Sequence, residues 1–178
     1  MTNKPKIIRK KFSKQLYADS NDVACNAVKH YFKQQLGFTL ISYADDVTNF
    51  KSDLIEINKS FFAEVERKLK FEDRWIWPTV HILERKAKML LSSPTFLCIV
   101  NNDCSKICIL SPDTLKEYIN NRYLEEVSNN KVKCGEKMYN VPIENAVIDN
   151  IPKEVETFFF GIDKTNDADA IAKKLGLK

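Results

Sequence analysis

The sequence predicts a mixed α/β domain in which a central sheet is flanked by helices. Apolar residues recur with helical spacing in residues 22–37, and three short strand-like segments follow them. A second helical stripe in residues 82–91 leads into residues 96–100, a continuously apolar run that is typical of a strand covered on both faces. The order helix, three strands, helix and two strands indicates one mixed sheet with helices packed against it.

The first half of the chain supplies one predicted helix and three predicted strands. The helix has an N-cap signal at residues 19–22 and ends at Gly37, where a glycine is favoured. Its apolar stripe consists of Ala24, Ala27, Val28, Tyr31 and Phe32. The strands are expected at residues 38–43, 53–57 and 61–68, with a turn at 58–60 between the last two.

The second half of the chain begins with an irregular connection. We expect residues 71–80 to be such a connection, packed by the aromatic rings of Trp75 and Trp77. The remaining predicted elements are a helix at 82–91, strands at 96–100 and 106–110, a helix at 111–118, a hairpin at 131–143 with its turn at 134–136, and a helix-prone end.

The length of 178 residues suggests one domain with short extensions. We expect a basic N-terminal arm at residues 1–13, a core at 14–120, a hairpin extension at 121–150 and a partly helical tail at 151–178. The formal net charge is +4, and the first 14 residues carry six Lys or Arg and no acid. Such an arm could follow a nucleic-acid backbone or could be a solvated terminus, and the sequence leaves both open.

The sequence also bears on membranes, compartment and cysteine chemistry. No apolar run reaches the roughly 18 to 20 residues of a membrane span, and the start has no apolar stretch of signal-peptide length. We therefore expect a cytoplasmic protein. The five cysteines include no CxxC pair, and His30 and His81 match no zinc spacing. Reduced thiols are expected in preference to a zinc site.

The most informative feature is a pair of adjacent predicted strands that both carry acid. In residues 61–68, Glu64, Glu66 and Lys68 alternate with apolar residues, so the three share one face of the strand. Unpaired charges on so apolar a strand are costly to bury. Asp53 opens the preceding strand, so Asp53 and Glu66 could hold a divalent metal ion with Lys68 beside it.

This arrangement resembles the PD-(D/E)xK nuclease superfamily, which includes type II restriction endonucleases and archaeal Holliday-junction resolvases. The resemblance lies in the order of the elements, with Asp53 opening the second strand and Glu66-Arg67-Lys68 near the end of the third. It covers roughly residues 14–118 and implies a restriction-endonuclease-like core. It also implies that Asp53 and Glu66 ligate Mg²⁺ (or Mn²⁺), and that Lys68 orients or helps to deprotonate the attacking water.

The composition of the site depends on how the two strands pair. In the register that we favour, Asp53 faces Glu66 and Lys68 follows on the same face, with Glu64 as an outer ligand. This register supplies the lysine directly. A tighter turn between the strands pairs Asp53 with Glu64 instead, and the site is then Asp53, Glu64 and Glu66.

Two positions depart from the superfamily's pattern. Ser52 stands where a proline usually precedes the first acid. Many relatives add an acid from the first helix, and Asp22 is the one candidate here, but its place at the predicted helix start favours a capping role.

Several other residues could contact nucleic acid. Arg85, Lys86 and Lys88 lie on the second predicted helix, where they could contact phosphates or form an ordinary polar face. Trp75 and Trp77 could stack on an unpaired base, although such a pair more often packs a loop against the body.

The sequence therefore predicts a Mg²⁺-dependent nuclease that acts on DNA, with a homodimer as one possible state. The alternative is a catalytically silent nuclease-like fold that binds nucleic acid or protein in a phage or mobile element. A third possibility is an RNA-directed nuclease, which differs only in its substrate. The acids and lysine could also form a solvent-facing ladder of ion pairs, each contributing about 0 to 1 kcal/mol.

Overall fold

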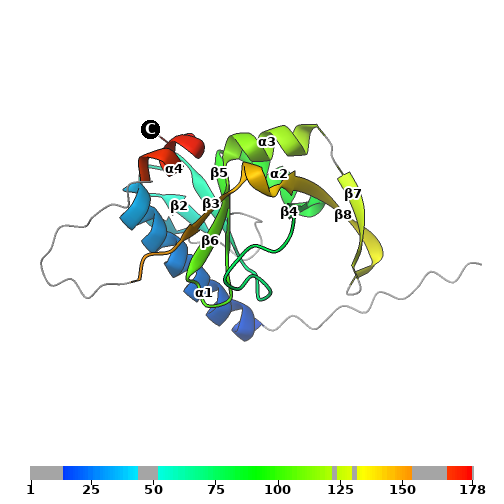
Figure 1. Cartoon of the computed structure of the whole chain (residues 1–178), viewed down its shortest axis with the longest axis horizontal. Coiled ribbons are helices and arrows are strands. Elements are labelled where there is room, and N and C mark those ends of the chain that lie inside the picture. The colour runs from blue at the N-terminus through cyan, green and yellow to red at the C-terminus, as the bar shows by residue number, and fades with distance from the viewer. Residues whose placement is uncertain (1–13, 44–51, 122–123, 130–131, 154–167, 178) are drawn as a thin grey trace, which may run out of the picture.

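A computed structural model describes residues 14–43, 52–121, 124–129, 132–153 and 168–177 of the chain (Figure 1). The basic arm that we predicted at residues 1–13 lies outside the described residues. No described helix combines the length and the apolar character needed to span a bilayer.

The described elements follow the predicted order, with additional strands. They are α1 (Lys14–Tyr31), the π-helical turn η1 (Phe32–Leu36), β1 (Leu40–Ser42), β2 (Leu54–Glu56), β3 (Phe62–Arg67), β4 (Thr79–Leu83), α2 (Glu84–Ser92), β5 (Thr95–Val100), β6 (Lys106–Leu110), α3 (Pro112–Asn120), β7 (Leu124–Asn129), β8 (Val132–Pro142), the 3₁₀ turn η2 (Ile143–Asn145), β9 (Val147–Asn150) and α4 (Ala168–Lys174).

The main sheet has six strands in the order β1-β2-β3-β5-β6-β9. The first three strands are antiparallel neighbours, whereas β5 is parallel to β3 because the chain crosses over through β4 and α2 before it returns. The strands β6 and β9 are again antiparallel to their neighbours. The predicted class, a mixed α/β sheet flanked by helices, is therefore confirmed.

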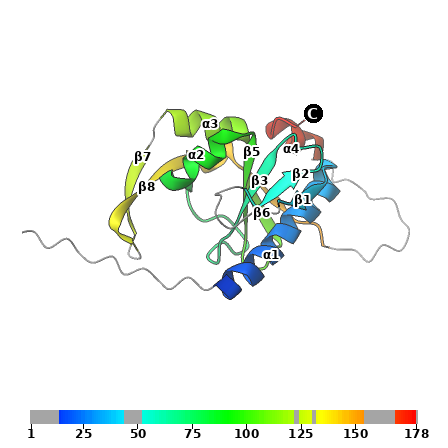
Figure 2. The same cartoon turned by 180° about the vertical axis from the view of Figure 1, so that it is seen from behind.

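Helices cover both faces of this sheet (Figures 1 and 2). On one face α1 packs against β3 and β5 in a core that includes Ala63, Val65 and Phe96. On the other face lie α2, α3 and a second sheet in the order β4-β8-β7. All six residues of β5 are buried, as the apolar run predicted.

The first helix begins earlier than predicted. It starts at Lys14, so Asp22 lies inside the helix on an exposed position, and the predicted capping role of Asp22 is wrong. No glycine or proline interrupts the chain between Lys14 and Tyr31, so the polar residues at 19–22 are carried within the helix. The predicted end at Gly37 is confirmed, with a left-handed φ of 76°.

The segment before α2 is a strand that the sequence analysis missed. We predicted a connection up to residue 80 and a helix from 82, but β4 pairs with β8 over its whole length. Val80 and Ile82 are buried and their neighbours are half-buried, which is the period of two that a strand requires.

The hairpin after α3 is displaced from its predicted position. Residues 134–136, predicted as its turn, lie within β8, and the last pair before the turn is Asn129 with Val132. Within the segment expected to be a hairpin extension, β9 returns to the main sheet and pairs with β6.

The turn between β2 and β3 fixes how the acidic strands meet. Leu54 pairs with Ala63, and Ile55 pairs with Phe62, so the register that we favoured is wrong and the tighter alternative is present. The Glu56 carboxylate folds back over this turn. This carboxylate accepts hydrogen bonds from the backbone N–H of Asn58 at 2.8 Å and the hydroxyl of Ser60 at 2.9 Å.

The turn gives a first prediction. Replacing Glu56→Gln exchanges one acceptor oxygen for an amide nitrogen, so part of this network is lost. We expect the free energy of unfolding in urea to fall by about 1 to 2 kcal/mol. Glu117→Gln, on an exposed position of α3, is the matched control and should change it by less than about 0.5 kcal/mol. Equal effects of the two substitutions would contradict the role given to Glu56.

Candidate functional site

Acidic side chains of β3 gather beneath α2. The alternation predicted for this strand is confirmed, because Ala63 and Val65 enter the core under α1 while Glu64 and Glu66 face the opposite side. Helix α2, which begins immediately after β4, covers the side of the sheet that Glu64 and Glu66 face.

Lys86 of α2 joins the two carboxylates. Its ammonium Nζ donates to Glu64 Oε1 at 2.8 Å and to Glu66 Oε1 at 2.6 Å. The side chains of Glu64, Lys86 and Glu66 are 11%, 23% and 33% exposed, so the group extends from the interior to the surface. Two carboxylates two residues apart on one strand thus converge on a single cation.

Asp53 lies at the edge of the same group. Continuing the observed β2–β3 register by one residue places Asp53 opposite Glu64. Because β2 begins only at Leu54, the carboxylate of Asp53 takes the place of a strand partner and accepts from the backbone N–H of Val65 at 2.8 Å. Its second oxygen accepts from the amide of Asn21 in α1 at 3.2 Å.

The cluster of Asp53, Glu64, Glu66 and Lys86, called the acidic cluster below, carries excess negative charge. Burial raises the pKa of Glu64 to about 7, with Asp53 and Glu66 adding to the rise and Lys86 opposing it. Burial alone would lower the pKa of Lys86, but its contacts with Glu66 and Glu64 outweigh burial and raise that pKa. One ammonium does not neutralise three carboxylates, so the cluster favours a further cation.

Lys68, predicted to lie beside the metal ion, packs against two tryptophan rings. Its ammonium lies 4.7 Å from the ring centre of Trp75 and 4.4 Å from that of Trp77, within cation–π range. Burial lowers the pKa of Lys68, against the opposing effect of Glu66. The two rings pack on each other at 5.1 Å, and Trp75 packs on Phe71 at 5.2 Å, so they fix the loop to the body.

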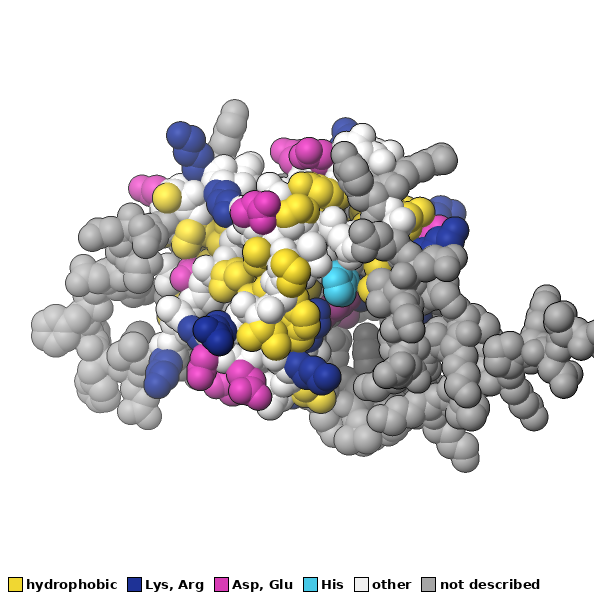
Figure 3. Space-filling model, turned by 45° about the vertical axis from the view of Figure 1, so that its right-hand side comes forward, with side chains coloured by type: hydrophobic (Ala, Val, Ile, Leu, Met, Phe, Trp, Pro, Cys, Tyr) yellow, Lys and Arg dark blue, Asp and Glu magenta, His cyan; other side chains and the backbone are white. Residues whose placement is uncertain are grey.

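The other predicted phosphate contacts remain predictions. Arg85 and Lys88 are exposed on α2, whereas Lys86 points into the acidic cluster. On the face seen in Figure 3, the Lys and Arg side chains of described residues are interspersed with Asp and Glu around apolar side chains. A nucleic acid on that face would meet both signs of charge.

The sequence did not predict the contacts that Lys86 and Asn21 make with the carboxylates of the acidic cluster. Lys86 was assigned to the solvent face of its helix, and Asn21 was treated as part of a cap. A signal for Lys86 exists, because Ala87 and Leu90 are the buried positions of α2 and Lys86 borders them.

The acidic cluster can be tested for its fit to a divalent metal. Among the described residues, no group of three or more His, Cys, Asp or Glu side chains is arranged to hold a metal ion. However, Glu64 and Glu66 each use only Oε1 toward Lys86, and the second oxygen of each accepts no hydrogen bond from a described residue. Mg²⁺ takes oxygen ligands and needs only one or two carboxylates, so the donor set fits.

The described cysteines lie in surroundings unlike those of metal-binding or redox-active thiols. Cys25, Cys98, Cys104 and Cys108 are free thiols, and three of them are buried. Burial raises the pKa of Cys25 and Cys108 to about 12, so these thiols stay protonated.

No known family model matches the sequence, and no curated protein matches it with significant similarity. Any functional conclusion therefore depends on the geometry of the acidic cluster and on the order of the elements.

The raised pKa of Glu64 gives a second prediction. The folded carboxyl binds a proton more tightly than the unfolded chain, whose pKa is near 4.5, so its contribution to stability is lost as pH rises through about 7. Glu64→Gln does not titrate. Between pH 5 and 8, we expect the free energy of unfolding of the wild type to fall relative to Glu64→Gln by about 1 to 3 kcal/mol.

Urea denaturation of both proteins at each pH measures this difference. The control is Glu117→Gln, whose difference from the wild type should stay flat over the same range. A wild-type protein that gains stability relative to Glu64→Gln as pH rises would show that Glu64 is held as a carboxylate.

Proposed function

We propose that this protein is a Mg²⁺-dependent nuclease that hydrolyses phosphodiester bonds of DNA at the acidic cluster. The observation that carries the proposal is the convergence of Glu64 and Glu66 on one cation, with Asp53 beside them and each glutamate keeping a second oxygen without a described partner. Such a group suits a hard divalent ion.

The topology supports a restriction-endonuclease-like core. The helix α1 precedes three consecutive antiparallel strands, and the crossover through α2 leads to β5, which is parallel to β3. This is the order of elements on which the sequence resemblance depends, and here it occurs within one sheet. Asp53 lies immediately before β2, and Glu64 and Glu66 lie on β3.

The residues would divide the work as follows. Glu64 and Glu66 would hold Mg²⁺, and Asp53 would add negative charge beside them. When bound, the ion neutralises charge on the phosphate and lowers the pKa of the attacking water. Because protons compete at Glu64, whose pKa is about 7, the site should take up metal more readily as pH rises.

Lys86, in place of Lys68, would be the lysine that acts next to the metal ion. Its ammonium lies within hydrogen-bond distance of both glutamates and is held charged by them. A fixed ammonium next to the ion adds positive charge where the transition state of phosphodiester cleavage is most negative. Lys68, held over two tryptophan rings, would serve mainly to fix the neighbouring loop.

The DNA would extend beyond the cluster. Arg85 and Lys88 on the exposed side of α2 would contact its phosphates, as would the basic arm, and a homodimer would allow both strands of a duplex to be cut.

One observation favours a second candidate, a catalytically silent fold that binds nucleic acid or protein in a phage or mobile element. Both oxygens of Asp53 are already engaged, by Asn21 and by Val65, and Lys86 already partly neutralises the two glutamates. Such a protein would bind its partner equally well in a chelator and would cut nothing.

The third prediction tests hydrolysis. The full chain should cut plasmid or single-stranded DNA in Mg²⁺ or Mn²⁺ and not in EDTA, and Glu66→Gln and Lys86→Ala should each lower the rate about 100-fold or more. Lys68→Ala should lower it less. Lys116→Ala, an exposed lysine of α3, is the matched control and should keep the wild-type rate.

Thermal unfolding of each variant checks that it remains folded. Cleavage that survives in a folded Lys86→Ala protein would remove Lys86 from the mechanism. Absence of metal-dependent cleavage by the wild type on any DNA or RNA tested, together with binding in EDTA, would favour the silent fold.

A further inference from the structure

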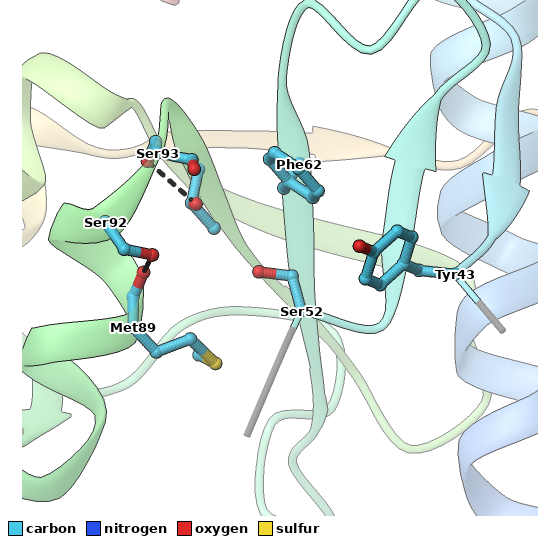
Figure 4. A pocket seen from close by; sticks show the side chains of 7 residues that line it. Tyr43, Ser52, Phe62, Met89, Ser92 and Ser93 are labelled. Atoms are coloured by element: carbon cyan, nitrogen blue, oxygen red, sulfur yellow. Dashed lines mark hydrogen bonds between the residues drawn. The ribbon is translucent and has the colours of Figure 1, made fainter. Parts of the chain in front are cut away.

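A cavity of about 200 Å³ opens between the start of β3 and the end of α2 (Figure 4). Its walls include the rings of Tyr43 and Phe62, the side chain of Met89, and the hydroxyl-bearing residues Ser52, Ser93 and Thr95. The two rings lie edge to face, with centres 5.7 Å apart. No charged side chain is among the described residues that line the cavity.

This lining suits a flat, uncharged group with polar edges. Aromatic and thioether surfaces favour the faces of a ring, and hydroxyls can donate to or accept from its edge. A phosphate or a carboxylate would find no cation among the described lining residues to balance its charge.

Ser52 places a hydroxyl in the wall of the cavity. The residue as a whole is only 6% exposed. Figure 4 shows this hydroxyl directed into the space between β3 and α2. A ligand with a hydrogen-bonding edge could donate to this hydroxyl or accept from it.

The cavity and the acidic cluster lie next to each other, because residues of both come from three shared segments of the chain: residues 52–53, β3 and α2. Ser52 precedes Asp53, and Phe62 lies two residues before Glu64 on the same face of β3. Two residues along a strand span about 7 Å. On α2, Met89 follows Lys86 by three residues, which are adjacent on a helix surface. A ligand that reaches from one site to the other therefore needs to be only about one nucleotide long.

We propose that this cavity holds one unpaired nucleobase of the strand whose backbone lies at the acidic cluster. This inference rests on the proposed function and narrows its substrate class. The enzyme would act on single-stranded DNA, or on a duplex in which a nucleotide is flipped out, because a base paired inside a helix cannot enter the cavity. Fully paired duplex would be a poor ligand.

The fourth prediction tests the cavity by binding. Short single-stranded DNA that carries 2-aminopurine is titrated with the full chain, in EDTA and separately in Ca²⁺. We expect its fluorescence to change on binding and expect an equal-length abasic strand to bind at least about tenfold more weakly. The matched duplex should also bind more weakly.

Two tryptophan substitutions on α2 locate the effect. Met89→Trp fills the cavity and should abolish the preference for bases over abasic strand. Leu91→Trp adds the same ring on the same helix at a position that does not line the cavity, and it should retain the preference. Ser52→Ala should weaken binding about threefold to tenfold.

Equal binding of abasic and base-containing strands by the wild type would overturn the proposal, as would a base preference that survives in a folded Met89→Trp protein. These measurements distinguish a failure of the base-binding proposal from a failure of the proposed nuclease activity. Base-dependent binding without cleavage in Mg²⁺ would support the base-binding cavity and contradict the proposed nuclease activity. Mg²⁺-dependent cleavage of the abasic strand at the full rate would support the nuclease activity and contradict the base-binding cavity.

Discussion

The ammonium of Lys86 lies between two carboxylates of β3, and much of the structure around it depends on that contact. Glu64 is buried on β3, so its charge is costly there unless a cation faces it. The lysine supplies the cation and ties α2 to β3 across the sheet face. It cannot neutralise the whole cluster, because Asp53 contributes a third carboxylate. Lys86 therefore binds the two glutamates together but leaves part of the negative charge of the acidic cluster unbalanced.

The β2–β3 turn decides which acids take part in that balance. A change of two residues in the register would place Asp53 opposite Glu66, at the exposed end of the strand, and would leave Glu64 without its neighbour. In the observed register, the Glu56 carboxylate accepts hydrogen bonds from Asn58 and Ser60 and so stabilises the tighter turn. A surface turn thus sets the electrostatics of a buried group on the next strand.

The sequence predicted the faces of β3, the buried β5 and the order of the core elements, because strand alternation and apolar runs are local signals. It left two registers open and favoured the wrong one, because two turns of similar length fit the same residues. The partner of the glutamates was missed for a related reason. The predicted helical stripe included Leu91, which is exposed, whereas the buried side of α2 is rotated toward Lys86. Such a small rotation changes which lysine faces the sheet, and helical periodicity alone does not resolve it.

The excess negative charge also has a consequence for substrate binding under the proposed function. With all its acids ionised, the cluster carries three negative charges and the one positive charge of Lys86, so a phosphate is repelled from it. A divalent ion would cancel the remaining two charges and remove that repulsion. Metal and nucleic acid would then strengthen each other's binding by the same factor, because coupling between two ligands is reciprocal. An uncharged base is not subject to this repulsion. Under both proposals it could therefore enter the cavity, whose described lining carries no charged side chain, before the backbone is held at the acids.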